Sequence, residues 1–219
     1  MYCGAKYETS KRRQVFYMNT VPSTTRIVPN WITALLATAC GVIVANLYYA
    51  QPLVGPISID THLPLASAGF IVTLTQIGYV IGLLFIVPLS DLIENRRLVS
   101  SILVVVICAL IAAALTHNAV IFLITSMFIG LGSVATQILV PYAAHLAPEE
   151  QRGQAVGNVM SGLLLGIMLA RPIASFVTDL WDWQMVFLLS AVITTILAVV
   201  LACILPRRNP SPSMSYVDL

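Results

Sequence analysis

Long stretches without a charged residue alternate with short polar segments along this chain. Six stretches reach or approach 20 residues, and they cover 28–59, 63–90, 98–116, 118–144, 153–178 and 183–206. Only Arg171 interrupts one of them. A helix of about 20 apolar residues crosses a hydrocarbon core of roughly 30 Å. The pattern therefore predicts an all-α membrane protein with six transmembrane helices.

The amino-acid composition indicates which solvent surrounds the chain and which partners to expect. The 219 residues are 58% hydrophobic and only 9% charged, whereas ordinary soluble domains are about a quarter charged. So few charges cannot cover a water-exposed surface, and the expected partner is a lipid bilayer. The net charge of +2 gives no reason to expect nucleic acid.

The basic residues predict the orientation in the membrane. Ten of the eleven Lys and Arg side chains lie in the N-terminal segment, the second and fourth loops and the tail: Lys6, Lys11, Arg12, Arg13, Arg26, Arg96, Arg97, Arg152, Arg207 and Arg208. The first, third and fifth loops hold none. Because short cytoplasmic loops are enriched in Lys and Arg, we expect both termini on the cytoplasmic side of the membrane.

Three regions are expected along the chain. Residues 1–28 form a polar cytoplasmic leader, 29–206 the transmembrane bundle, and 207–219 a Pro- and Ser-rich linker. Within the bundle, Pro52 and Pro56 are expected to close the first span. The cysteines and histidines show no metal-ligand spacing, and no catalytic or phosphate-binding pattern is present. We therefore expect no metal, no cofactor and no enzyme activity.

Several polar side chains lie inside the spans, where they are tolerated if they face water or another helix. The candidates for lining a substrate cavity are Asn46, Tyr49, Gln76, Gln137 and Arg171. Tyr48 and Gln51 fit an interfacial aromatic belt or a loop better than a cavity. For Arg171, snorkelling to the outer interface is the alternative to a cavity role.

Small residues recur at helical spacing on two spans. Gly162 and Gly166 belong to a ridge of small or short side chains from Asn158 to Ala174, and Gly78 and Gly82 form a shorter one. Such ridges allow membrane helices to approach closely. The third and sixth spans carry almost nothing polar beyond Ser and Thr, and they are expected to be outer braces.

Three motifs carry a resemblance to a known family. They are ANLYYAQPLVGPI at 45–57, GLLFIVPLSDLIENRRLV at 82–99 and LAPEEQRGQAVGNVMSGLLLGIMLAR at 146–171. From Trp31 onward, the chain resembles the major facilitator superfamily, and within it a bacterial subgroup of uncharacterised drug-efflux-like carriers. The resemblance implies the N-terminal half of a twelve-span bundle, built from 3+3 inverted repeats, with spans one, two, four and five around a cavity. The chain would then end in the linker that precedes a second half, and the resemblance implies a location in the inner membrane of a bacterium.

The same resemblance implies a gate at the second cytoplasmic loop. Asp91 and Arg96, with Arg97 following, match the charged residues that lock helix ends together in one of the family's two states, and a solvated turn is the alternative. The surrounding signature departs from the family at Val87, Leu92, Glu94 and Asn95. Ser126 stands where drug–proton antiporters of the family carry an arginine.

By resemblance, the chain is expected to be a secondary transporter that couples efflux of small organic molecules to protons. The alternative is a truncated, non-transporting membrane fragment, or a half-transporter subunit that needs a partner. The partner would be a second copy of the chain or a separately encoded second half.

Overall fold

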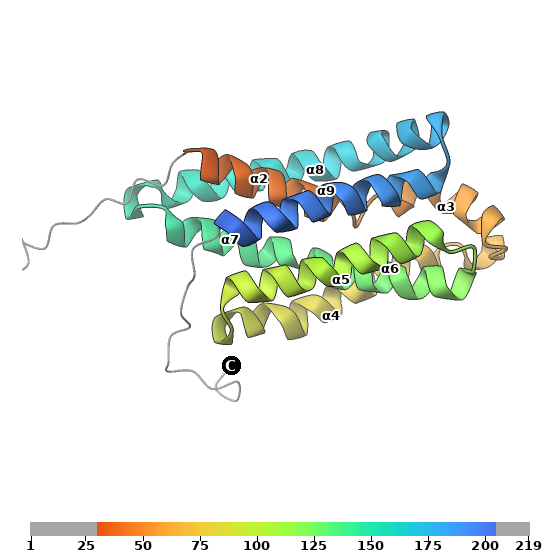
Figure 1. Cartoon of the computed structure of the whole chain (residues 1–219), viewed down its shortest axis with the longest axis horizontal. Coiled ribbons are helices and arrows are strands. Elements are labelled where there is room, and N and C mark those ends of the chain that lie inside the picture. Colours follow the sequence, from red (N-terminus) through yellow and green to blue (C-terminus); the bar gives the residue numbers. More distant parts are fainter. Residues whose placement is uncertain (1–29, 205–219) are drawn as a thin grey trace, which may run out of the picture.

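The computed structural model describes residues 30–204. The predicted leader (1–28) and linker (207–219) lie outside the described residues. Over this range the chain folds into a bundle of helices (Figure 1). The helices are α2 (Asn30–Ala45), α3 (Ala50–Asp60), α4 (Phe70–Leu92), α5 (Asn95–Leu115), α6 (Ala119–Ser133), α7 (Ala135–Leu146), α8 (Arg152–Leu180) and α9 (Trp183–Ile204), with 3-10 turns η1 (Leu65–Ser67) and η2 (Glu149–Gln151).

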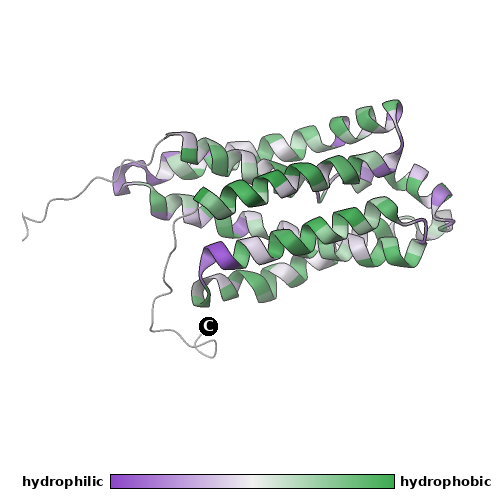
Figure 2. Ribbon diagram, viewed as in Figure 1, coloured by the Kyte–Doolittle hydropathy of each residue, from purple (hydrophilic) through white to green (hydrophobic). Residues whose placement is uncertain are grey.

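These helices make six spans that are long and apolar enough to cross a membrane. The first span combines α2 with α3, the fourth combines α6 with α7, and α4, α5, α8 and α9 supply the others. Hydrophilic residues gather toward the two ends of the bundle, while the helix shafts are predominantly hydrophobic (Figure 2). The prediction of an all-α protein with six spans is confirmed.

The first span is interrupted in its middle and does not end where its prolines suggested. The α-helix breaks between Ala45 and Ala50 and then resumes to Asp60. Pro52 lies in the first turn of α3, where its missing N–H has no intrahelical partner to lose, and Pro56 is accommodated further along the same helix. The expectation that Pro52 and Pro56 close the first span was therefore wrong.

The fourth span has a matching interruption at Val134. It follows Gly132 and Ser133, and Gly/Ser pairs are a recognised cause of helix kinks. The Gln137 N–H then bonds the Val134 carbonyl at 2.9 Å, a three-residue step that tightens the start of α7. Spans one and four are thus both discontinuous, whereas spans two and five are not.

The helix packing also relates the first three spans to the last three by a two-fold relation. The three most extensive helix pairs are α4 with α6, α2 with α8, and α5 with α9. If span one is exchanged with span four, two with five and three with six, the α4–α6 pair becomes the α8–α2 pair. The α5–α9 pair is left unchanged by the same exchange. The packing therefore agrees with two three-span repeats of inverted topology.

Glycines let the helices of the two equivalent pairs approach closely. In the α2–α8 pair, a Cβ added at Gly41 would lie 2.7 Å from the Gly162 carbonyl oxygen, and one at Gly166 would collide with the Gly41 backbone. In the α4–α6 pair, a Cβ added at Gly82 would lie 2.7 Å from the Leu131 carbonyl oxygen. A Cβ added at Gly78 or Gly130 would likewise collide with the backbone of the partner helix. At these positions the backbone of the partner helix leaves no room for a side chain.

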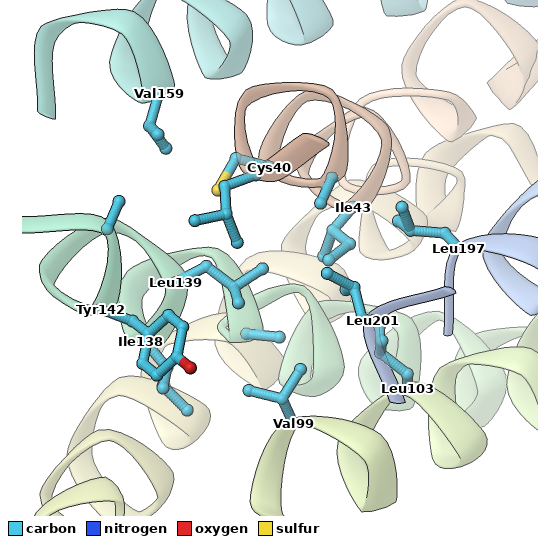
Figure 3. Packing of buried hydrophobic residues seen from close by; sticks show 14 of the residues in the cluster. Cys40, Ile43, Val99, Leu103, Ile138, Leu139, Tyr142, Val159, Leu197 and Leu201 are labelled. Carbon is cyan, nitrogen blue, oxygen red and sulfur yellow. The ribbon is translucent and has the colours of Figure 1, made fainter. Parts of the chain in front are cut away.

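Two apolar clusters fill the interior. The cluster shown in Figure 3 joins five helices through Cys40, Ile43, Val99, Leu103, Ile138, Leu139, Tyr142, Val159, Leu197 and Leu201. The second cluster contains three aromatic rings, Phe122, Trp183 and Phe187, which meet edge to face with centroids 5.5–5.9 Å apart. Edge-to-face contacts of this kind stabilise beyond the area they bury, and here they hold α6 against α9.

The most exposed helices are not the ones expected to be outer braces. Only 22% of the most apolar stretch is buried in the second and in the fifth span, against 50% in the third and 33% in the sixth. Each of these four helices packs extensively on one partner helix, and α4, α8 and α9 each also turn one apolar side outward. Within residues 30–204, large apolar faces are therefore left for lipid or another bundle on α4, α8 and α9.

We predict that Gly166→Ala lowers the free energy of unfolding by about 1–3 kcal/mol, because the new methyl group forces α2 and α8 apart. Gly157→Ala on the same helix is the control, since a Cβ there meets nothing within 4 Å and should stabilise α8 slightly. Unfolding by denaturing detergent, followed by circular dichroism, measures both. Equal stability of the two variants would contradict the proposed contact.

Candidate functional site

A groove runs along the contact between α2 and α8. It has a volume of about 510 Å³, and its lining includes Ala37, Gly41, Tyr49, Gly162, Leu169 and Ile173. Because the contact is made by glycine and alanine, few side chains rise to fill it. Two polar residues of the lining, Thr38 and Ser161, donate their hydroxyls to carbonyls one turn earlier in their own helices. The groove is therefore largely apolar.

A cross-helix hydrogen bond joins the predicted cavity residue Arg171 to α3. Arg171 Nε donates to Gln51 Oε1 at 2.9 Å. Ala170 and Ile173, which flank Arg171 in α8, line the groove, as does Tyr49, two residues before Gln51. The pair therefore stands beside the groove. An arginine at this depth costs a few kcal/mol on insertion scales, and the amide oxygen offsets part of that cost.

A second cross-helix hydrogen bond joins α4 to α7. Gln137 Nε2 donates to the hydroxyl oxygen of Tyr79 at 2.8 Å, and both residues are half-buried. The sequence had singled out Gln137 but not Tyr79. A lone tyrosine in an apolar span carries no pattern that would have revealed its role.

The two pairs join spans that the two-fold relation exchanges. Gln51 lies in the first turn of α3 and Gln137 in the first turn of α7, each directly after the break in its span. Each also lies nine residues before the last residue of its helix, Asp60 or Leu146. Their partners belong to the fifth and second spans, which the same relation exchanges. Discontinuous helices at membrane depth are typical of binding sites in transporters.

Asn46 is brought to a different place from the other cavity candidates. It is 2% exposed, and its Oδ1 accepts a hydrogen bond from the Ser190 hydroxyl of α9. Its Nδ2 has no partner among the described residues. The break after Ala45 turns Asn46 toward the interior, away from the groove that Tyr49 lines. A three-residue spacing puts two side chains on one face only in an unbroken helix, and the break falls between Ala45 and Ala50.

Gln76 is also separated from the two pairs. It is half-buried on α4 and lines a shallow surface hollow of about 420 Å³ formed by residues of α4 alone, among them Thr73 and Val80. The structure therefore groups Tyr49 and Arg171 at the α2–α8 groove, pairs Gln137 with Tyr79 between α7 and α4, and leaves Gln76 on an outward face.

The predicted gate residues lie around the α4–α5 loop. Asp91 is in the last turn of α4, and its side chain is not among those described. Arg96 is half-buried in the first turn of α5. Arg97 Nε contacts Glu94 Oε2 at 3.0 Å, an ion pair within the loop itself. Because the Arg97 side chain is exposed to solvent, the pair contributes little to stability.

A polar cluster lies at the opposite end of the bundle. Asp60 Oδ2, at the end of α3, lies 2.8 Å from His117 Nδ1 and accepts a hydrogen bond of 3.2 Å from Gln184 Nε2. One carboxylate thereby joins three segments that are distant in sequence. Among the described residues, no group of three or more His, Cys, Asp or Glu could hold a metal ion.

The fold and the paired polar groups define one six-helix half of a membrane transport bundle. The sequence profile of the Major Facilitator Superfamily matches residues 31–215. The chain belongs to the major facilitator superfamily.

Two relatives show how much of a family member this chain represents. It is 41% identical over 188 residues to "Uncharacterized transporter YgaY" of Escherichia coli O157:H7, which covers 86% of this chain and 48% of the relative. It is 33% identical over 181 residues to "Probable transporter SCO4007" of Streptomyces coelicolor, which covers 80% of this chain and 42% of the relative. The chain spans about half the length of these curated relatives.

A solved structure supports the fold at low sequence similarity. The inward-open conformation of the xylose transporter XylE from E. coli superposes with a TM-score of 0.69 at 17% identity, over 80% of this chain and 47% of that one. At this identity the likeness concerns the fold alone.

We predict that Ser190→Ala lowers the free energy of unfolding by about 1–3 kcal/mol, because it leaves the buried Asn46 amide without its hydrogen bond. Adding Asn46→Leu should recover much of the loss, since both polar partners are then replaced. Thr195→Ala is the control, because that hydroxyl only bonds the Ala191 carbonyl of its own helix. Thermal unfolding in detergent measures all three. If Ser190→Ala matches the control, the interior role of Asn46 is wrong.

Proposed function

We propose that this chain forms the N-terminal half of a secondary transporter that couples the export of small organic molecules to protons. The observation that carries the proposal is the two hydrogen bonds between helices, Gln51–Arg171 and Gln137–Tyr79, each beside the break of a discontinuous span. In transporters, broken helices and polar groups at membrane depth surround the substrate, and the two halves rock about that site.

The residues have separate roles in this proposal. Tyr49, Gln137 and Arg171 line the substrate path together with Gln51 and Tyr79. Asn46 holds the broken first span against α9, and Gln76 lies on a face of α4 that meets the second bundle. Asp91 and Arg96, with Arg97 beside them, form the cytoplasmic gate. Export follows from the resemblance to efflux-type carriers.

Proton coupling would use acids at the helix ends. In residues 30–204, the carboxylates lie at helix ends or in loops, and Arg171 is the one charged residue well inside a span. The Asp60–His117 pair at the outer end has both a carboxylate and an imidazole within 2.8 Å.

The proposed transport unit contains a second six-span bundle. The outward faces of α4 and α8, with Val80, Leu84, Leu164 and Met168 exposed, would pack on it. The second bundle would come from further residues of a longer protein, from a second copy of this chain or from a separate chain. A fragment that reaches the membrane but transports nothing is the competing possibility.

Transport is tested in an E. coli strain without its major efflux pumps, expressing the chain alone or together with the second half of the E. coli relative. We expect reduced retention of a panel of fluorescent organic substrates, and loss of the effect with a protonophore. Gln137→Leu should lower export about tenfold, corresponding to ~1.4 kcal/mol. Gln154→Leu on the exposed first turn of α8 is the matched control. Unchanged retention in every arm would refute the transporter.

The proposed orientation gives a separate prediction. In a variant without the four native cysteines, a cysteine at His117 should react with an impermeant maleimide in intact cells, because that loop would face outward. A cysteine at Arg97 should react only after the membrane is opened, since the second loop would face the cytoplasm. The reverse pattern would show that both termini lie outside.

A further inference from the structure

The charge of Arg171 is not neutralised by the described part of the protein. The described ion pairs involve Arg97, His117 and Arg152, and none includes Arg171. Its described partner is the neutral amide oxygen of Gln51. A buried or membrane-embedded cation is normally paired with an anion, so the counter-charge is missing from residues 30–204.

The hydrogen bond to Gln51 leaves the binding end of the guanidinium unused. Only Nε donates to Gln51 Oε1, at 2.9 Å, and the side chain is exposed. A guanidinium has five N–H donors in a fixed planar fork. The four on the two terminal nitrogens therefore remain for a planar oxyanion, and a carboxylate matches that fork with two parallel hydrogen bonds.

The Gln51 contact also favours a binding role over snorkelling. Arg171 lies nine residues before Leu180, about 14 Å along α8 from its outer end. A snorkelling arginine extends toward the interface along its own helix. Here the Nε bond holds the side chain against α3 instead, beside the groove between α2 and α8.

The surroundings of Arg171 are apolar and adaptable. On the same flank of α8, Leu164 and Met168 are 60% and 65% exposed. The neighbouring groove of about 510 Å³ lies within the range that accepts a drug-sized molecule. Methionine side chains adjust to ligands of varied shape. The ligand that fits this chemistry has one oxyanion and a hydrophobic body.

We propose that Arg171, positioned by Gln51, recognises the carboxylate of a small amphipathic organic anion, whose apolar body lies along the groove between α2 and α8. This assignment rests on the proposed transport function and specifies the class of its substrate. A lipid headgroup phosphate presents a similar oxyanion, and the test below distinguishes the two sources.

The test uses the whole chain, purified in neutral detergent, and two probes of equal shape: 6-phenylhexanoate and 6-phenylhexanamide. Titration calorimetry should give a Kd at least about tenfold lower for the acid than for the amide. Arg171→Gln should abolish this preference, and Arg171→Lys should retain part of it because the charge remains without the fork. Arg152→Gln, at an exposed arginine of the same helix, should leave both Kd values unchanged.

Equal affinity for acid and amide in the unmodified protein would overturn the proposal, and this comparison does not depend on any variant folding. Persistence of the preference in Arg171→Gln would overturn it too. The measurement is repeated in nanodiscs of phosphatidylcholine with and without phosphatidylglycerol. If the anionic lipid abolishes acid binding through Arg171, the residue holds a lipid headgroup and the proposal is wrong. Acid binding that survives in both nanodiscs supports it.

Failure of this inference and failure of the proposed function give different results. Export that is equally fast for acids and their neutral amides would keep the transporter and remove the carboxylate site. Arg171-dependent carboxylate binding without any export would keep the binding site and remove the transport function.

Discussion

Close backbone contact between α2 and α8, and between α4 and α6, determines where every other feature of this bundle can lie. Glycines at both contacts let the helices meet along their main chains. With no side chain between them, the helices have a fixed spacing and register. That register brings Arg171 to Gln51 and Tyr79 to Gln137, and it leaves the α2–α8 groove open beside the first pair.

The lipid environment explains why these backbone contacts matter for the stability of the bundle. Between membrane helices there is no hydrophobic driving force comparable to that in water, so close van der Waals packing and interhelical hydrogen bonds hold the bundle. The broken first and fourth spans would expose backbone groups to lipid if they faced outward. Both breaks are instead turned into the bundle, where polar side chains accumulate. The requirement to shelter irregular backbone thus coincides with the hydrogen bonds between helices beside each break.

The sequence was sufficient for the spans, because a run without charges is a local property. It also identified the small-residue ridges, since helical spacing follows directly from the order of residues. It failed at Pro52 because a proline ends a helix or begins one depending on the turn in which it lies. It did not reveal Tyr79 or the role of Gln51, and it misplaced Asn46. Partners across helices depend on the break geometry and interhelical register, which no single-span pattern contains.

The aromatic contact at the α6–α9 junction gives the molecule a built-in optical reporter. Of the chain's three tryptophans, Trp183 is 5% exposed against Phe122 and Phe187, whereas Trp31 and Trp181 are 54% and 59% exposed. Brominated acyl chains or aqueous quenchers should therefore extinguish the emission of the latter two and spare the first. The surviving, blue-shifted fluorescence would report on this one junction.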